Sequence, residues 1–168
     1  MGSRETEKRA ATPNPNGFVM MDIDAHHEDD GIVPTNLFEA FEAASRRHQA
    51  AGFWALSEVD RVLISIWMLE ADVNNGGFHQ YYFNSAGDTA YYAPTALRAI
   101  GARAMADIVE RANARFGPDG PPKGRNVRQE ALFALPDSLG LWADLDLQFF
   151  AYPDDLAMLL EQFLESNS

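Results

Sequence analysis

The segment from Glu70 to Asn84 gathers the polar side chains with the widest scope for chemistry. Glu70 lies on an apolar helical face, four residues after Ile66 and three before Val73. A carboxylate at such a position must be paired or protonated, because burying an unpaired charge is costly. If burial raised its pKa, Glu70 could serve as a general base in an enzyme or a small-ligand module. The side chains that would complete such a site are Asn75, His79, Gln80 and Asn84.

The same segment also fits a structural interpretation. The sequence Asn74-Asn75-Gly76-Gly77 predicts that one helix stops and another begins. The first N–H groups of the new helix lack intrahelical partners and form a positive end, which could receive the Glu70 carboxylate. We favour a hydrogen-bonded structural junction over a catalytic site. Its expected members are Glu70, Asn75, Gly76, Gly77, Gln80 and Asn84.

A second polar cluster, His26-His27-Glu28-Asp29-Asp30, combines imidazoles with carboxylates. These side chains bind metal ions, but adjacent loop residues rarely converge on one ion, so we expect a solvated acidic turn and no metal. The chain has no cysteine, which excludes disulfides and thiolate-based sites. His79 has neither a cysteine nor a serine-nucleophile motif as partner. We therefore expect no catalytic residue and no cofactor.

Hydrophobic periodicity predicts the helices that position these residues. Apolar residues recur every three or four positions from Val59 to Val73, which indicates a core helix. Ser57, with Asp60 three residues later, is close to a capping box at its start. The aromatic run from Phe78 to Phe83 predicts a further helix with three rings on one side, as core and not as a base-stacking platform. Those rings belong to Phe78, Tyr81 and Tyr82.

Proline and glycine mark the other helix boundaries. In chain order, the expected helices run from Pro34-Thr35-Asn36 to Gly52, begin near Pro94, cover residues 102–116, reach Leu135 after the loop at residues 117–124, and begin at Pro153-Asp154-Asp155. The apolar stretch from Leu139 to Tyr152 should pack heavily. We expect an all-α protein: a disordered tail at residues 1–16, then a single compact bundle of about six to eight helices over residues 17–168.

The formal net charge of −12 is concentrated in two segments without bases. Residues 17–45 and 129–168 contain acidic residues and no lysine or arginine, whereas residues 46–128 are nearly balanced. These ends would repel nucleic acid, because binding phosphates needs Lys and Arg, but they would attract a basic protein. In the last helix, Asp154, Glu161 and Glu165 would fall on one side, opposite the apolar residues. Carboxylates one turn apart have a spacing comparable to that of phosphates along one DNA strand.

No run in the sequence approaches the roughly 18 apolar residues of a spanning helix, and no apolar h-region of a secretory signal follows Met1. We expect a cytoplasmic protein that does not associate with membranes.

The segment Glu70-x-x-Val73-Asn74-Asn75-Gly76-Gly77-Phe78-x-Gln80-Tyr81-Tyr82-Phe83-Asn84-Ser85-x-Gly87 resembles the signature of the DNA-mimic protein family, an acidic domain otherwise of unknown function. Two later segments also resemble that family, and the similarity covers roughly residues 50–165. They are Ala96-Leu97-x-x-Ile100-Gly101-Ala102 and Leu145-Asp146-x-x-Phe149-Phe150, the latter followed by Asp154-Asp155-Leu156-x-x-Leu159-Leu160. The resemblance implies an α-helical homodimer. In the founding member it also implies an acidic surface that imitates duplex DNA and occupies the DNA-binding face of a transcription regulator.

The favoured function is therefore binding to the basic surface of a DNA-binding protein, in competition with DNA and without catalysis. The candidate partner-binding residues are Asp144, Asp146, Asp154, Asp155, Glu161 and Glu165, extended by Glu28, Asp29 and Asp30. Four arginines on the central helices depart from a uniform mimic: Arg98, Arg103, Arg111 and Arg115. Two alternatives stay open: a small-ligand module or enzyme centred on Glu70, Asn75 and Gln80, and a passive dimeric scaffold whose acidity only keeps it soluble.

Overall fold

The computed structural model describes residues 35–168, where the regular structure is entirely helical. The α-helices are α1 (Thr35–Ala51), α2 (Glu58–Phe83), α3 (Ala93–Ala99), α4 (Arg103–Ala114), α5 (Arg125–Ala134), α6 (Ala143–Phe150) and α7 (Leu156–Ser166). Two short 3-10 segments, η1 (Phe53–Ala55) and η2 (Ser85–Thr89), connect them. The all-α prediction is confirmed. The predicted tail, the start of the domain at residue 17 and the cluster at residues 26–30 lie outside the described residues.

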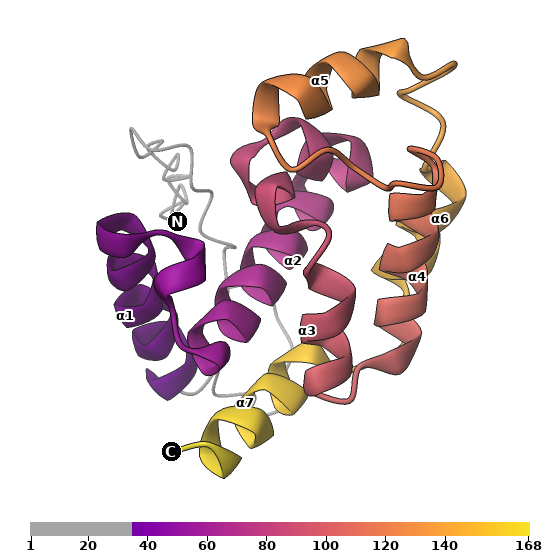
Figure 1. Ribbon diagram of the computed structural model, residues 1–168. Coiled ribbons are helices and arrows are strands. Elements are labelled where there is room, and N and C mark those ends of the chain that lie inside the picture. Colours follow the sequence, from indigo (N-terminus) through magenta and orange to yellow (C-terminus); the bar gives the residue numbers. More distant parts are fainter. Residues whose placement is uncertain (1–34) are drawn as a thin grey trace, which may run out of the picture. The chain divides into compact units, whose positions relative to one another are not determined.

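Helix α2 is the central element, and it packs against α1, α3, α5, α6 and η2 (Figure 1). It begins as predicted, because the Ser57 side chain accepts a hydrogen bond from the Asp60 N–H at 3.1 Å. The predicted apolar face is also confirmed: Val62, Ile66 and Val73 are fully buried. A second packing layer forms where α4 contacts both α3 and α6. Most of the signature segment, residues 70–83, therefore lies on the helix that contacts most of the other helices.

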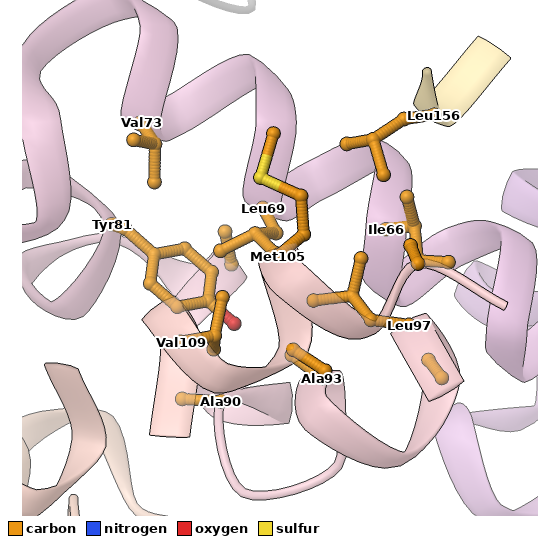
Figure 2. Close-up of a cluster of buried hydrophobic side chains, with 14 of the residues drawn as sticks. Ile66, Leu69, Val73, Tyr81, Ala90, Ala93, Leu97, Met105, Val109 and Leu156 are labelled. Atoms are coloured by element: carbon orange, nitrogen blue, oxygen red, sulfur yellow. The ribbon is translucent and has the colours of Figure 1, made fainter. Parts of the chain in front are cut away.

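One cluster of the hydrophobic core lies between α2, α3, α4 and the first turn of α7, as Figure 2 shows. Its labelled side chains include Ile66, Leu69, Val73, Leu97, Met105, Val109 and Leu156, all completely buried. Each buried aliphatic side chain of this size contributes about 1.5–3 kcal/mol to stability. Ala93 on α3 and Ala106 on α4 are also completely buried. Small side chains of this kind let helix backbones approach closely, which explains the extensive α3–α4 contact.

The stretch from Leu139 to Tyr152 packs less completely than predicted. Trp142, Leu145 and Phe149 are buried, but Leu139 is 81% exposed and Leu147 is 72% exposed. Helix α6 rests on α2 and α4 with one face and turns the other to solvent. The prediction from the number of apolar residues therefore overestimated the burial of this stretch, because burial depends on which helix face each residue occupies.

Candidate functional site

Helix α2 bends at Gly76 and Gly77. Gly76 and Gly77 leave the helical φ/ψ region, and Gly77 has a φ of 71°, in the left-handed region that favours glycine. A Cβ atom on Gly77 would also lie 2.6 Å from Oδ2 of Asp146. Both the backbone angle and the close carboxylate therefore require glycine here. The predicted helix stop is confirmed as a sharp bend between two halves of α2.

The new helical half that starts after the bend is capped by Asp146. The Phe78 N–H donates to Asp146 Oδ1 at 2.8 Å, so a side chain from α6 satisfies a free amide and faces the positive helix end. Burial raises the pKa of Asp146, and the Phe78 N–H opposes that shift by stabilising the charged form. The expectation that Glu70 would receive this helix end is wrong. Asp146 follows Phe78 by 68 residues in the sequence, so a local sequence pattern could not identify it as the cap.

Glu70 instead pairs with a tyrosine from the turn between α6 and α7. The Tyr152 hydroxyl donates to Glu70 Oε1 at 2.7 Å, and the Asn74 side-chain amide donates to the same hydroxyl. Burial raises the pKa of Glu70, the Tyr152 hydrogen bond lowers it, and the negative charge of Asp155 raises it further. Tyr152 adopts a φ of 45°, which is unusual for a residue with a side chain. The Glu70 contact thus fixes the α6–α7 turn on α2.

A second carboxylate, Asp72, organises the amides of the signature. Gln80 Nε2 and Asn84 Nδ2 donate to Asp72 Oδ1 at 3.4 and 3.2 Å. Burial raises the pKa of Asp72, and these two hydrogen bonds oppose the shift. The sequence analysis did not assign a role to Asp72. It lies eight residues before Gln80 and twelve before Asn84, and multiples of four residues along a helix place side chains on a similar side. Asn75 is exposed and joins neither network.

The signature residues therefore serve two separate networks and the bend. Glu70 bonds through Tyr152, whereas Gln80 and Asn84 bond through Asp72. His79 is half-buried, and its Nε2 atom makes no hydrogen bond within residues 35–168. The neighbouring aromatic rings of Phe78, Tyr81 and Tyr82 are completely buried, as predicted. This distribution of partners is typical of a structural junction, and it does not gather the polar groups around one ligand.

Arg128 is the second unpredicted centre of polar contacts. Although it is charged, its side chain is completely buried. Its guanidinium donates to the carbonyls of Tyr82, Asn84, Pro122 and Lys123 and to the Asp88 carboxylate, at 2.7–3.1 Å. A Cβ on Gly87 would lie 2.7 Å from Arg128 Nε, so the glycine makes room for it. Arg128 thereby joins the end of α2, η2 and the loop before α5.

The predicted acidic surface divides into carboxylates with structural partners and carboxylates without them. Asp154 Oδ2 accepts from the Met105 N–H at 2.9 Å, near the start of α4. Asp155 caps its own helix by accepting from the Met158 N–H at 3.1 Å. Asp144 pairs with Arg115 at 3.2 Å. Because α7 begins at Leu156, Asp154 does not continue a helical row with the two glutamates, contrary to the expectation.

Glu161 and Glu165 lie one turn apart on α7, opposite its buried residues Leu156 and Leu160. Glu165 is exposed and Glu161 is half-buried. Neither forms an ion pair with any described residue. Glu28, Asp29 and Asp30 lie outside the described residues.

Over residues 55–167, which is more than half of the chain, the sequence matches the family described as DMP19-like protein. The chain belongs to the DMP19-like family. This is a DNA-mimic family, the family that the sequence resembles. No curated protein and no solved structure matches the chain.

The arginines of this DMP19-like chain are largely engaged by nearby acceptors. Arg98 contacts Glu110 at 2.7 Å and Asp107 at 3.4 Å, and its hydrogen bond lowers the pKa of Glu110. Arg111 donates to the Gln148 side chain at 2.6 Å. With the Arg115–Asp144 pair, these contacts place three arginine side chains on and around α4 beside an acceptor, and they partly neutralise the paired carboxylates.

Within residues 35–168 no group of three or more histidine and acidic side chains is placed to hold a metal ion. In the same part of this DMP19-like chain, no helix is both long enough and apolar enough to cross a membrane.

Proposed function

We propose that this protein is an acidic DNA mimic that binds the basic DNA-binding surface of a partner, such as a transcription regulator, and competes with DNA for it. Membership of the DMP19-like family over residues 55–167 is the observation that carries the proposal. The mechanism needs no bond-making step, because occupation of the DNA-binding surface by itself prevents DNA from binding.

The distribution of charge on the C-terminal segment supports this function. No base follows Arg128 in the sequence, and of the acidic residues after it only Asp144 forms an ion pair with another of the described residues 35–168. Glu161 and Glu165, one turn apart on α7, and the exposed Asp155 at its start form the proposed centre of the binding surface. Unscreened carboxylates of this kind attract Lys and Arg of a partner and accelerate its association.

We propose that the other candidate carboxylates act on a partner mainly through their electrostatic field and not through direct contact. Asp146 and Asp154 accept hydrogen bonds from backbone N–H groups, so their side chains have fixed orientations. Asp144 already shares its charge with Arg115. We propose that these three residues strengthen the negative potential around α7, and that Glu28, Asp29 and Asp30 extend it. We propose that the acting unit is a homodimer, as the family resemblance implies.

Capture from a cell lysate tests the proposal. The full-length protein is immobilised and exposed to lysate at about 50 mM and about 500 mM salt, because screening weakens surface electrostatics steeply over this range. We expect a DNA-binding protein to be retained at low salt, lost at high salt, and displaced by duplex DNA. A chain that retains no DNA-binding protein, or retains one that DNA does not displace, would instead act as a passive scaffold.

A further inference from the structure

A cavity of about 340 Å³ lies away from the Glu70 network and from α7. It is lined by side chains from the end of α1, η1, α2, η2, Tyr91 and the loop before α5. Its volume falls in the range of about 300–1,000 Å³ that is usual for small-molecule sites. None of the acidic residues proposed to bind a partner takes part in its walls. The function proposed above therefore does not account for it.

Aromatic rings form one side of this cavity. The ring centroids of Phe53 and Trp54 lie 5.4 Å apart, and those of Trp54 and Tyr91 lie 6.0 Å apart. Trp54 is 64% exposed, although an indole of this size is usually buried. Exposed and adjacent rings offer a planar ligand a stacking surface, as aromatic side chains do for nucleobases in nucleic-acid complexes. The geometry therefore suits a flat, apolar group.

The charged groups around the cavity determine the sign of the ligand. The Lys123 ammonium lies 4.4 Å from the Tyr91 ring centroid and forms no ion pair within residues 35–168. Among the described residues, the one carboxylate in the wall is that of Asp88, and the Arg128 guanidinium pairs with it at 2.7 Å. The Arg61 guanidinium also lies over Trp54, 5.9 Å from its ring centroid. A cationic ligand would meet positive charge beside both rings, whereas an anion would be attracted.

We propose that this cavity binds a planar aromatic ring that carries one anionic group. The ring stacks against Trp54 and Tyr91, and the anion lies beside the Lys123 ammonium. Indole-3-acetate is a suitable probe because two relatives separate the contributions: tryptamine keeps the ring and reverses the charge, and acetate keeps the carboxylate and lacks the ring.

Isothermal titration calorimetry of the full-length protein tests the proposal with these three probes. We expect saturable one-site binding of indole-3-acetate, at least about fivefold weaker binding of tryptamine, and no measurable binding of acetate. The expected difference between indole-3-acetate and tryptamine is that of an exposed ion pair, and stacking of the ring supplies the rest of the binding affinity. Equal affinities for indole-3-acetate and tryptamine, or no saturation with indole-3-acetate up to the millimolar range, would overturn the proposal.

Two substitutions locate the binding. Trp54→Ala should weaken indole-3-acetate binding roughly tenfold, and Lys123→Gln about threefold to fivefold. The matched controls are Phe133→Ala, an aromatic side chain that is also 64% exposed, and Arg125→Gln, an exposed base near Lys123 that does not line the cavity. Both controls should leave the affinity unchanged. If the controls weaken binding as much as the cavity variants do, the ligand binds elsewhere and the assignment is wrong.

Discussion

Gly77 and Asp146 show how one position can be required by two independent constraints. The φ of 71° favours glycine at residue 77, and the Asp146 carboxylate fills the space that a Cβ would take. The same carboxylate accepts the Phe78 N–H and so caps the second half of α2. The role of Gly77 at a helix stop could be predicted from the sequence, because the signals that end a helix are local. The capping role of Asp146 could not be predicted, because the N–H group that it accepts lies on another helix.

Substitution of Gly77 separates the two constraints. Gly77→Ala should lower the free energy of unfolding by roughly 2–4 kcal/mol, because it combines backbone strain with displacement of the Asp146 cap. Gly101→Ala is the matched control, since its φ is 87° and no atom would lie within 4 Å of the new Cβ. It should cost about 1 kcal/mol, from strain alone. Equal losses in urea denaturation would contradict the double role of Gly77.

Glu70→Gln tests whether burial controls the ionisation of Glu70. Burial raises the folded-state pKa of Glu70 above its ordinary value of 4.5, so the folded chain binds this proton more tightly than the unfolded chain does. The stability from this group is present below the unfolded pKa and is lost as the pH rises through the folded pKa. Glutamine does not titrate and still accepts from the Tyr152 hydroxyl.

The variant should therefore gain stability relative to the wild type as the pH rises from about 4 to about 7. Urea unfolding at several pH values measures the difference directly. A difference that is constant across this range, or that falls with rising pH, would show that Glu70 is not held in a site that disfavours its charge.

At the scale of the elements, local signals identified the helices and their ends. Ser57 caps α2 and Pro94 lies in the first turn of α3, both as expected, and the helix expected over residues 102–116 corresponds to α4. These features depend on residues close in sequence, so one chain is enough to recognise them. The start of α7 was placed too early, because Asp154 was counted with the helix although its carboxylate turns toward Met105.

Arg128 illustrates what local signals leave out. In the sequence it is one base among several in a polar segment, and nothing nearby indicates burial. Its position follows from the way α5 packs on α2 and η2, which brings four carbonyls and one carboxylate to the same guanidinium. The planar fork of arginine serves several acceptors at once, and lysine cannot reproduce it.

Arg128→Lys should lower the free energy of unfolding by roughly 3–5 kcal/mol, because the buried carbonyl of Tyr82 and the part-buried carbonyl of Asn84 lose their donor. Arg125→Lys, on the exposed side of the same helix, is the matched control and should change stability by less than about 0.5 kcal/mol. Thermal and urea unfolding provide the comparison. A loss at Arg128 as small as that at Arg125 would mean that the guanidinium contacts add little stability.

At the scale of the whole molecule, the sequence predicted the sign of the charge but not its arrangement. The net charge of −12 and the base-free segments follow from composition. Only the structure distinguishes Asp146 and Asp154, which accept backbone N–H groups, from Glu161 and Glu165, which have no such contact with any residue of the described range 35–168. The distinction concentrates the proposed binding surface on α7.

Charge reversal on α7 tests the central claim most directly. Glu161→Lys/Glu165→Lys is compared with Asp119→Lys/Glu130→Lys, which changes the net charge equally at exposed positions outside the proposed surface. The affinity of each for a captured DNA-binding protein is measured in competition with duplex DNA. The account predicts at least about tenfold weaker binding for the α7 variant and little change for the control. Equal affinities for the two variants would contradict the account, since net charge would then matter and the α7 surface would not.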